Sequence, residues 1–130
     1  MRVVLVADEK WIVEEVLAAL GESRFHVTHV ADSAAVVDAC DDHNADLVVT
    51  DLQVGSMGGM AVIRSVRAAV AAGRLGPTPA VLLLDREVDA FIGRRSGADA
   101  WLRKPFGGFQ LRELLDSLVC PPVAAEEPRP

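Results

Sequence analysis

The sequence has little of what marks nucleic-acid-binding or membrane-spanning proteins. Basic residues are outnumbered 13 to 19 by acidic ones, and the formal net charge is −6. This deficit argues against direct nucleic-acid binding, because a broad footprint needs a basic stripe to neutralise phosphates. No apolar stretch approaches the ~18 residues of a membrane span, so we expect no membrane partner. The first residues are strand-like and show no cleavable signal pattern.

Cysteine and histidine are also scarce, and neither shows metal-binding spacing. Cys40 and Cys120 lie far apart in the sequence. We expect both to be buried or half-buried thiols in a reducing cytosol, and hence a cytoplasmic protein. The histidines His26, His29 and His43 do not form pairs at ligand spacing. We expect them at strand edges or in loops.

The apolar residues gather in five short runs that alternate with amphipathic stretches. Hydrophobic residues make up 51% of the 130 positions, which is enough for one domain with a proper core. The expected strands are Arg2–Ala7, Phe25–Val30, Asp46–Thr50, Ala80–Leu84 and Asp99–Arg103. The expected helices are Trp11–Leu20, Ser33–Cys40 after an Asp32 N-cap, Met60–Ala72, Glu87–Arg95 and Phe109–Val119. Strict alternation predicts an α/β fold with a five-stranded parallel sheet and helices on both faces.

The end of the chain differs in composition from the rest. Residues 120–130 are rich in Pro, Ala and Glu and contain too little apolar surface to pack. We therefore expect one domain over residues 1–119, followed by a flexible tail.

Charged side chains close three of the five apolar runs. Asp8 and Glu9 follow the first run, Asp51 closes the third, and Lys104 follows the fifth. The carboxyl ends of parallel strands meet at one edge of a sheet, where open α/β sheets place their ligand sites. Three carboxylates and a lysine at that edge indicate a divalent cation and phosphoryl chemistry. The alternative for any single acid is a solvated carboxylate at a strand end.

Glycines follow Asp51 at fixed spacing, with Gly55 four residues on and Gly59 eight residues on. These glycines do not form a dinucleotide or P-loop motif. A second stretch, Gly97–Phe106, reads Gly-Ala-Asp-Ala-Trp-Leu-Arg-Lys-Pro-Phe. Together with the acidic pair of the first run, these motifs stand in the order and spacing of the receiver domain of two-component response regulators. The chain resembles that family from residue 2 to about residue 119.

The resemblance implies a flavodoxin-like three-layer sandwich with strand order 2-1-3-4-5. It also implies that Asp51 is the phosphoryl acceptor and that Lys104 contacts first Asp51 and then the phosphoryl group. Pro105 would be preceded by a cis peptide bond. Magnesium would be the cofactor, and the implied ligands are Asp8, Glu9, Asp51 and the backbone carbonyl of Gln53.

The chain departs from the family pattern at four positions. Glu9 replaces the usual Asp, and Gly55 replaces the usual Pro, which makes that loop less rigid by composition. Trp101 stands where the family has its smaller switch aromatic. The family's Ser or Thr after the fourth strand is replaced by Leu84 or Asp85, depending on how the strand is aligned. If Asp85 takes this switch position, we expect it to turn outward or to pair with Arg86.

The resemblance implies a phosphoryl acceptor rather than an enzyme, with at most self-catalysed phosphorylation and dephosphorylation. A sensor histidine kinase or phosphotransfer protein would supply the phosphoryl group. The chain would be a stand-alone receiver, a monomer or weak homodimer, that signals through its fourth helix, fifth strand and fifth helix. Residues expected on that face are Arg94, Arg95, Phe109 and Arg112.

Two other functions stay open from the sequence. The first is a degenerate receiver that acts as an interaction module independent of phosphorylation, which the missing hydroxyl and Trp101 favour. The second is a flavodoxin-like cofactor binder on the same sheet. It is disfavoured because the acidic loop after the first strand would repel a phosphate.

Overall fold

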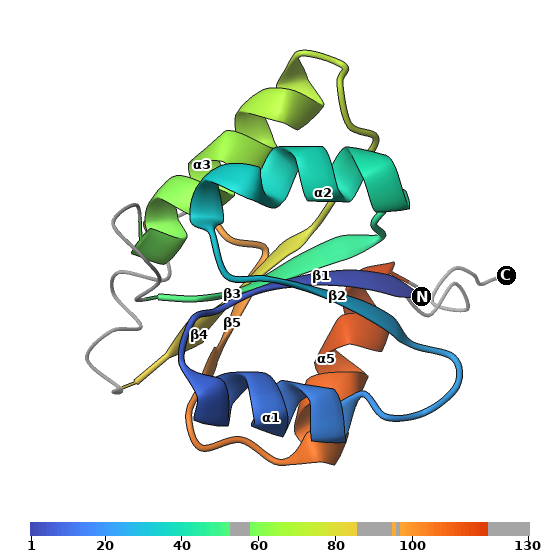
Figure 1. The fold of residues 1–130 in the computed structure, drawn as a ribbon, viewed down its shortest axis with the longest axis vertical. Helices are drawn as coiled ribbons and strands as arrows, with labels where there is room; N and C mark the ends of the chain where they lie inside the picture. Colours follow the sequence, from blue (N-terminus) through green and yellow to red (C-terminus); the bar gives the residue numbers. More distant parts are fainter. Residues whose placement is uncertain (53–57, 86–94, 96, 120–130) are drawn as a thin grey trace, which may run out of the picture.

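Five parallel strands form one sheet in the order β2-β1-β3-β4-β5, as expected from the family resemblance. The computed structural model describes residues 1–52, 58–85, 95 and 97–119 (Figure 1). The strands are β1 (Arg2–Val6), β2 (His26–Val30), β3 (Leu47–Asp51), β4 (Ala80–Leu84) and β5 (Ala100–Arg103). The α/β class and the strand order are therefore confirmed.

The helices lie in two layers, one on each face of the sheet (Figure 1). They are α1 (Lys10–Ala19), α2 (Val36–His43), α3 (Gly58–Ala71) and α5 (Gly108–Val119). A short 3₁₀ turn, η1 (Ser33–Ala35), precedes α2, and the Asp32 side chain caps it by accepting a hydrogen bond from the Ala34 N–H. In the described part of the chain, no helix combines the length and hydropathy of a membrane span.

Several sequence-based expectations fall on residues outside the described part. The helix expected at Glu87–Arg95 is described only at its last residue, and the tail expected at 120–130 is not described. Five single residues named in the sequence analysis also lie outside the described part: Gln53, Gly55, Arg86, Arg94 and Cys120.

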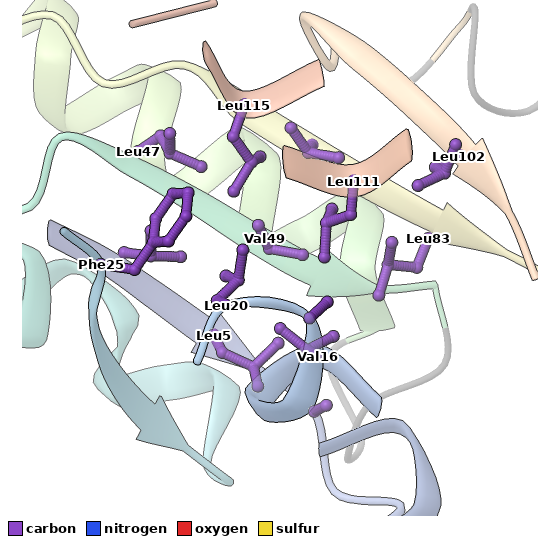
Figure 2. Close-up of a cluster of buried hydrophobic side chains, with 14 of the residues drawn as sticks. Leu5, Val16, Leu20, Phe25, Leu47, Val49, Leu83, Leu102, Leu111 and Leu115 are labelled. Atoms are coloured by element: carbon purple, nitrogen blue, oxygen red, sulfur yellow. The ribbon is translucent and has the colours of Figure 1, made fainter. Parts of the chain in front are cut away.

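One face of the sheet packs against α1 and α5. The side chains of a strand alternate between the two faces, and the odd-numbered residues of β1, β3 and β4 point to this side. Figure 2 shows Val16 of α1 and Leu111 and Leu115 of α5 in the same buried cluster as the strand residues Leu5 and Val49. This cluster holds the sheet against α1 and α5.

The other face packs against α2 and α3. Val4, Val6 and Val48 lie in one cluster with Val36 and Val66 from those helices. A smaller cluster joins Ile63 of α3 to residues of β4, and Trp101 on the edge strand β5 packs against it. Trp101 therefore packs at the edge of the sheet. Because the centre of the sheet is covered on both faces, β1, β3 and β4 are almost continuously apolar.

Candidate functional site

Three charged side chains meet where β3, β4 and β5 end. Asp51 follows the buried Val49 by two residues, and Asp85 follows Leu83 in the same way. Lys104 stands two residues after a third member of that cluster, Leu102.

The period of two along a strand carries all three side chains toward the face covered by α1 and α5. Parallel pairing of β3 with β4 and of β4 with β5 brings the three strand ends side by side. The site is therefore a continuation of the core face beyond the last apolar residue of each strand.

The Lys104 ammonium group is the centre of this site. Its Nζ lies 2.7 Å from Asp51 Oδ1 and 2.6 Å from Asp85 Oδ1. Lys104 is 6% exposed and Asp51 is 1% exposed, whereas the Asp85 side chain is 43% exposed. The contact expected between Lys104 and Asp51 is present, and a cis peptide bond precedes Pro105, as expected. A buried cation is thus held between one buried and one half-exposed carboxylate.

Asp85 corrects an expectation drawn from the sequence. The prediction that it turns outward is wrong, because its carboxylate binds Lys104. The alternative prediction, a pair with Arg86, involves a residue outside the described part of the chain. The backbone explains this position: the Lys104 N–H donates to the carbonyl oxygen of Leu84, which brings the next residue, Asp85, beside Lys104. A buried ammonium attracts a second anion strongly, because its own hydration is lost.

The structure also shows which of Leu84 and Asp85 faces the charged site. Leu84 is 1% exposed and packs with Ile63 on the α3 side of the sheet. Asp85 points to the opposite side, toward Lys104. Asp85, not Leu84, is therefore the residue that faces the charged site.

Burial and pairing act against each other on the two buried charges. Burial raises the pKa of Asp51, the bond to Lys104 lowers it, the charge of Asp85 raises it again, and the net shift is upward. Burial by itself lowers the pKa of Lys104, but the hydrogen bonds and charges of Asp51 and Asp85 outweigh it, and that pKa is raised. Lys104 is therefore fully charged at neutral pH.

The second oxygen of Asp51 is buried and has no hydrogen-bond partner. Oδ1 accepts from Lys104, whereas Oδ2 is the buried side-chain polar atom without a partner in the described part of the chain. A carboxylate oxygen in this situation suits a hard cation such as Mg²⁺, which prefers oxygen ligands. The donor chemistry of the site thus fits magnesium.

The expected acidic ligands are not yet gathered around that oxygen. Asp8 and Glu9 are exposed, and Glu9 is the residue from which α1 begins. Among the described residues, no three His, Cys, Asp or Glu side chains form a group that could hold a metal ion. The described residues therefore do not show Asp8, Glu9 and Asp51 as one metal-binding group.

Gly59 fixes the backbone beside Asp51. A Cβ atom on Gly59 would lie 2.3 Å from the Asp51 carbonyl oxygen and 3.0 Å from Leu82 Cδ1. The Gly59 N–H donates to the Leu52 carbonyl oxygen at 2.8 Å, and the preceding Gly58 has a φ of 78°. The spacing from Asp51 to Gly59 in the sequence thus reflects a close approach between the start of α3 and the end of β3.

Trp11 is the residue at the site that the sequence did not reveal. Its ring centroid lies 5.6 Å from Lys104 Nζ, within the range of a cation–π contact, and the residue is 48% exposed. Its position two residues after Glu9, in the first turn of α1, was the available signal. Helical periodicity hid it, since Ile12 and Val16 define the buried face of that helix.

The surface expected to contact a downstream protein is only partly as predicted. Phe109 is 68% exposed. Arg112, however, is wrongly placed on that surface, because its Nη1 donates to the Ala19 carbonyl oxygen and its Nε lies 3.4 Å from Glu22. These contacts place the Arg112 side chain on the side of α5 that faces α1.

The sequence matches the model of the response regulator receiver domain family over residues 3–116. The sensory transduction protein RegX3 of Mycobacterium bovis is 30% identical over 109 residues, which are 84% of this chain and 46% of that protein. The transcriptional activator protein PfeR of Pseudomonas aeruginosa is 31% identical over 120 residues, or 91% of this chain and 37% of its own length. The chain therefore spans less than half the length of these curated relatives.

Solved structures show the same fold at low sequence identity. The chemotaxis protein CheY4 of Vibrio cholerae superposes with a TM-score of 0.76 at 24% identity, covering 90% of this chain and 97% of that one. The receiver domain of the sensor histidine kinase PA1611 of Pseudomonas aeruginosa has a TM-score of 0.71 at 24% identity, with 91% and 96% covered. That second structure holds a magnesium ion in its active site cleft.

Proposed function

Since the chain belongs to the response regulator receiver domain family, we propose that it accepts a phosphoryl group on Asp51 in a two-component signalling pathway. The observation that carries the proposal is the state of the Asp51 carboxylate. One oxygen is held by Lys104, and the other is buried without a partner. The carboxylate is thus a nucleophile beside a fixed positive charge, and its second oxygen is left without a protein partner among the described residues.

The transfer itself requires little of the protein beyond position and charge. An Asp51 carboxylate oxygen forms a bond to phosphorus, the bond from phosphorus to the donor breaks, and an acyl phosphate remains on Asp51. The departing electron pair stays with the donor. The Lys104 ammonium, 2.7 Å from Asp51 Oδ1, neutralises negative charge on the transferring oxygens. No general base is needed, because Asp51 attacks as a carboxylate.

Magnesium is part of the proposal. Asp51 would hold it together with Asp8, Glu9 and the backbone carbonyl of Gln53. When bound, Mg²⁺ neutralises phosphoryl oxygens and orients them for in-line attack. The buried oxygen Asp51 Oδ2 supports this assignment.

The proposed partners follow from the family. A sensor histidine kinase or a phosphotransfer protein would donate the phosphoryl group in the cytoplasm. A downstream protein would contact the surface near β5 and α5, where Phe109 is exposed and a groove runs between Trp101 and Leu114. Because the curated relatives are longer, the signalling mode and the stand-alone form stay predictions.

Intact mass spectrometry tests the acceptor directly. The protein is incubated with Mg²⁺ and a small phosphodonor such as acetyl phosphate, and the mass of one added phosphoryl group is sought. We expect this mass in the wild type and its absence in Asp51→Asn and in samples with the metal chelated. An unmodified wild type would reject the acceptor function and favour an interaction module. Addition to Asp51→Asn at the wild-type level would place the acceptor elsewhere.

A further inference from the structure

We propose that Asp85 is an internal anion that competes with the incoming phosphoryl group for Lys104. The inference rests on the proposed acceptor function and goes beyond it. In the unmodified protein, the Asp85 carboxylate pairs with the Lys104 ammonium group, which phosphoryl transfer needs. The side chain that replaces the family's hydroxyl would therefore hold the site in a resting state.

The contacts of Lys104 carry the argument. An ammonium group has three N–H donors and no acceptor. Two carboxylate oxygens, one from Asp51 and one from Asp85, lie within hydrogen-bond distance of Nζ, and the ring of Trp11 lies 5.6 Å away. A phosphoryl oxygen that needs this ammonium group must share it with these partners or displace one of them.

Exposure decides which partner leaves. Asp51 is 1% exposed and cannot exchange Lys104 for water, whereas the Asp85 side chain is 43% exposed. A half-exposed carboxylate can rotate into solvent and regain its hydration, which a buried one cannot. Asp85 is therefore the displaceable partner.

Charge gives the competition its direction. Asp51, Asp85 and Lys104 together carry −1, and a phosphoryl group on Asp51 makes the site more negative. Like charges ~4 Å apart at an effective dielectric near 20 repel by several times the thermal energy. Asp85 must therefore leave Lys104 when Asp51 is phosphorylated, or it slows the transfer by repelling the donor.

Rates of phosphoryl uptake test this competition. The rate from acetyl phosphate with Mg²⁺ is measured by intact mass for the wild type, Asp85→Asn and Asp85→Thr. The matched control is Asp42→Asn, which removes one exposed acid on α2 far from Lys104 in the fold. We expect both Asp85 variants to react roughly fivefold faster than the wild type or more, and the control to match the wild type. The advantage should shrink at high salt, because exposed charges are screened.

Each outcome decides a separate question. Uptake by the wild type and Asp85→Asn at equal rates, or slower uptake by the variant, would overturn the competition and leave the acceptor function intact. If the wild type and both Asp85 variants all fail to take up a phosphoryl group, the acceptor function is rejected. The proposed competition for Lys104 is then rejected with it. A rate advantage of the Asp85 variants that stays the same at high salt would also overturn the proposal. Such an advantage would come from changed packing, which ionic strength does not affect, and not from the loss of a charge.

Discussion

Lys104 has two carboxylate partners, of which Asp51 is buried and Asp85 is half-exposed. A buried ion pair is weak evidence for stability, because the loss of hydration offsets most of the attraction. The pKa of Asp51 is raised because burial and the charge of Asp85 together outweigh the pairing with Lys104. The buried charge of Asp51 is therefore expected to cost the fold some stability, and this cost can be measured by removing that charge.

Asp51→Asn is expected to stabilise the metal-free protein by on the order of 1 kcal/mol at pH 7. The folded-state pKa of Asp51 lies above its ordinary value of 3.8, so its charged form is disfavoured by folding. The wild type therefore loses stability as the pH rises from the unfolded pKa through the raised folded pKa. Lys104 keeps Asp85 as its partner in the variant.

Urea unfolding of both proteins without metal gives the comparison. The gain should be present at pH 7 and should disappear below the unfolded pKa, where Asp51 is protonated in both states. Asp42→Asn serves as the control and should change the unfolding free energy by less than about 0.5 kcal/mol. A lower urea midpoint for Asp51→Asn at pH 7 would mean that the pair with Lys104 stabilises the fold.

At the scale of elements, α3 positions the acceptor through its first turn. The helix begins at Gly58 and Gly59, and the second of these lies against the backbone of Asp51. The end of β3 and the start of α3 can approach this closely only because Gly59 has no side chain. The conformation of Asp51 therefore depends on a residue that carries no functional group.

Gly59→Ala is expected to destabilise the protein by about 1–3 kcal/mol, the range for an overpacked site. The added Cβ would lie 2.3 Å from the Asp51 carbonyl oxygen, so the strand end or the helix must shift. Gly76→Ala is the matched control, because nothing lies within 4 Å of a Cβ at Gly76. Urea denaturation measures both variants. Equal midpoints would contradict the close approach of α3 to Asp51.

At the scale of the whole molecule, the sequence predicted the elements better than the contacts between them. Continuous apolar runs mark strands that are covered on both faces, and β1 and β4, expected at Arg2–Ala7 and Ala80–Leu84, were found in this way. Periodicity cannot order the strands, because each buried strand presents apolar residues to any neighbour. The order 2-1-3-4-5 came from the family resemblance.

The sequence predicted those site residues whose positions follow from the ends of the strands alone. Asp51 and Lys104 stand at the carboxyl ends of parallel strands, so their meeting at one sheet edge could be expected. The position of Asp85 depends on its contact with Lys104, which lies on another strand end and which no local pattern encodes. The contact of Trp11 with Lys104 likewise depends on how α1 packs on the sheet, and helical periodicity placed Trp11 off the buried face.

The most direct test of the account is to identify the residue that carries the phosphoryl group. The protein is phosphorylated with Mg²⁺ and acetyl phosphate and then reduced with borohydride, which converts an aspartyl phosphate to homoserine. Peptide mass spectrometry locates the change. The account predicts homoserine at position 51 in the wild type and in Asp85→Asn, with more of it in the variant at early times. Homoserine at position 8 or 85, or none at all after reduction, would contradict the account.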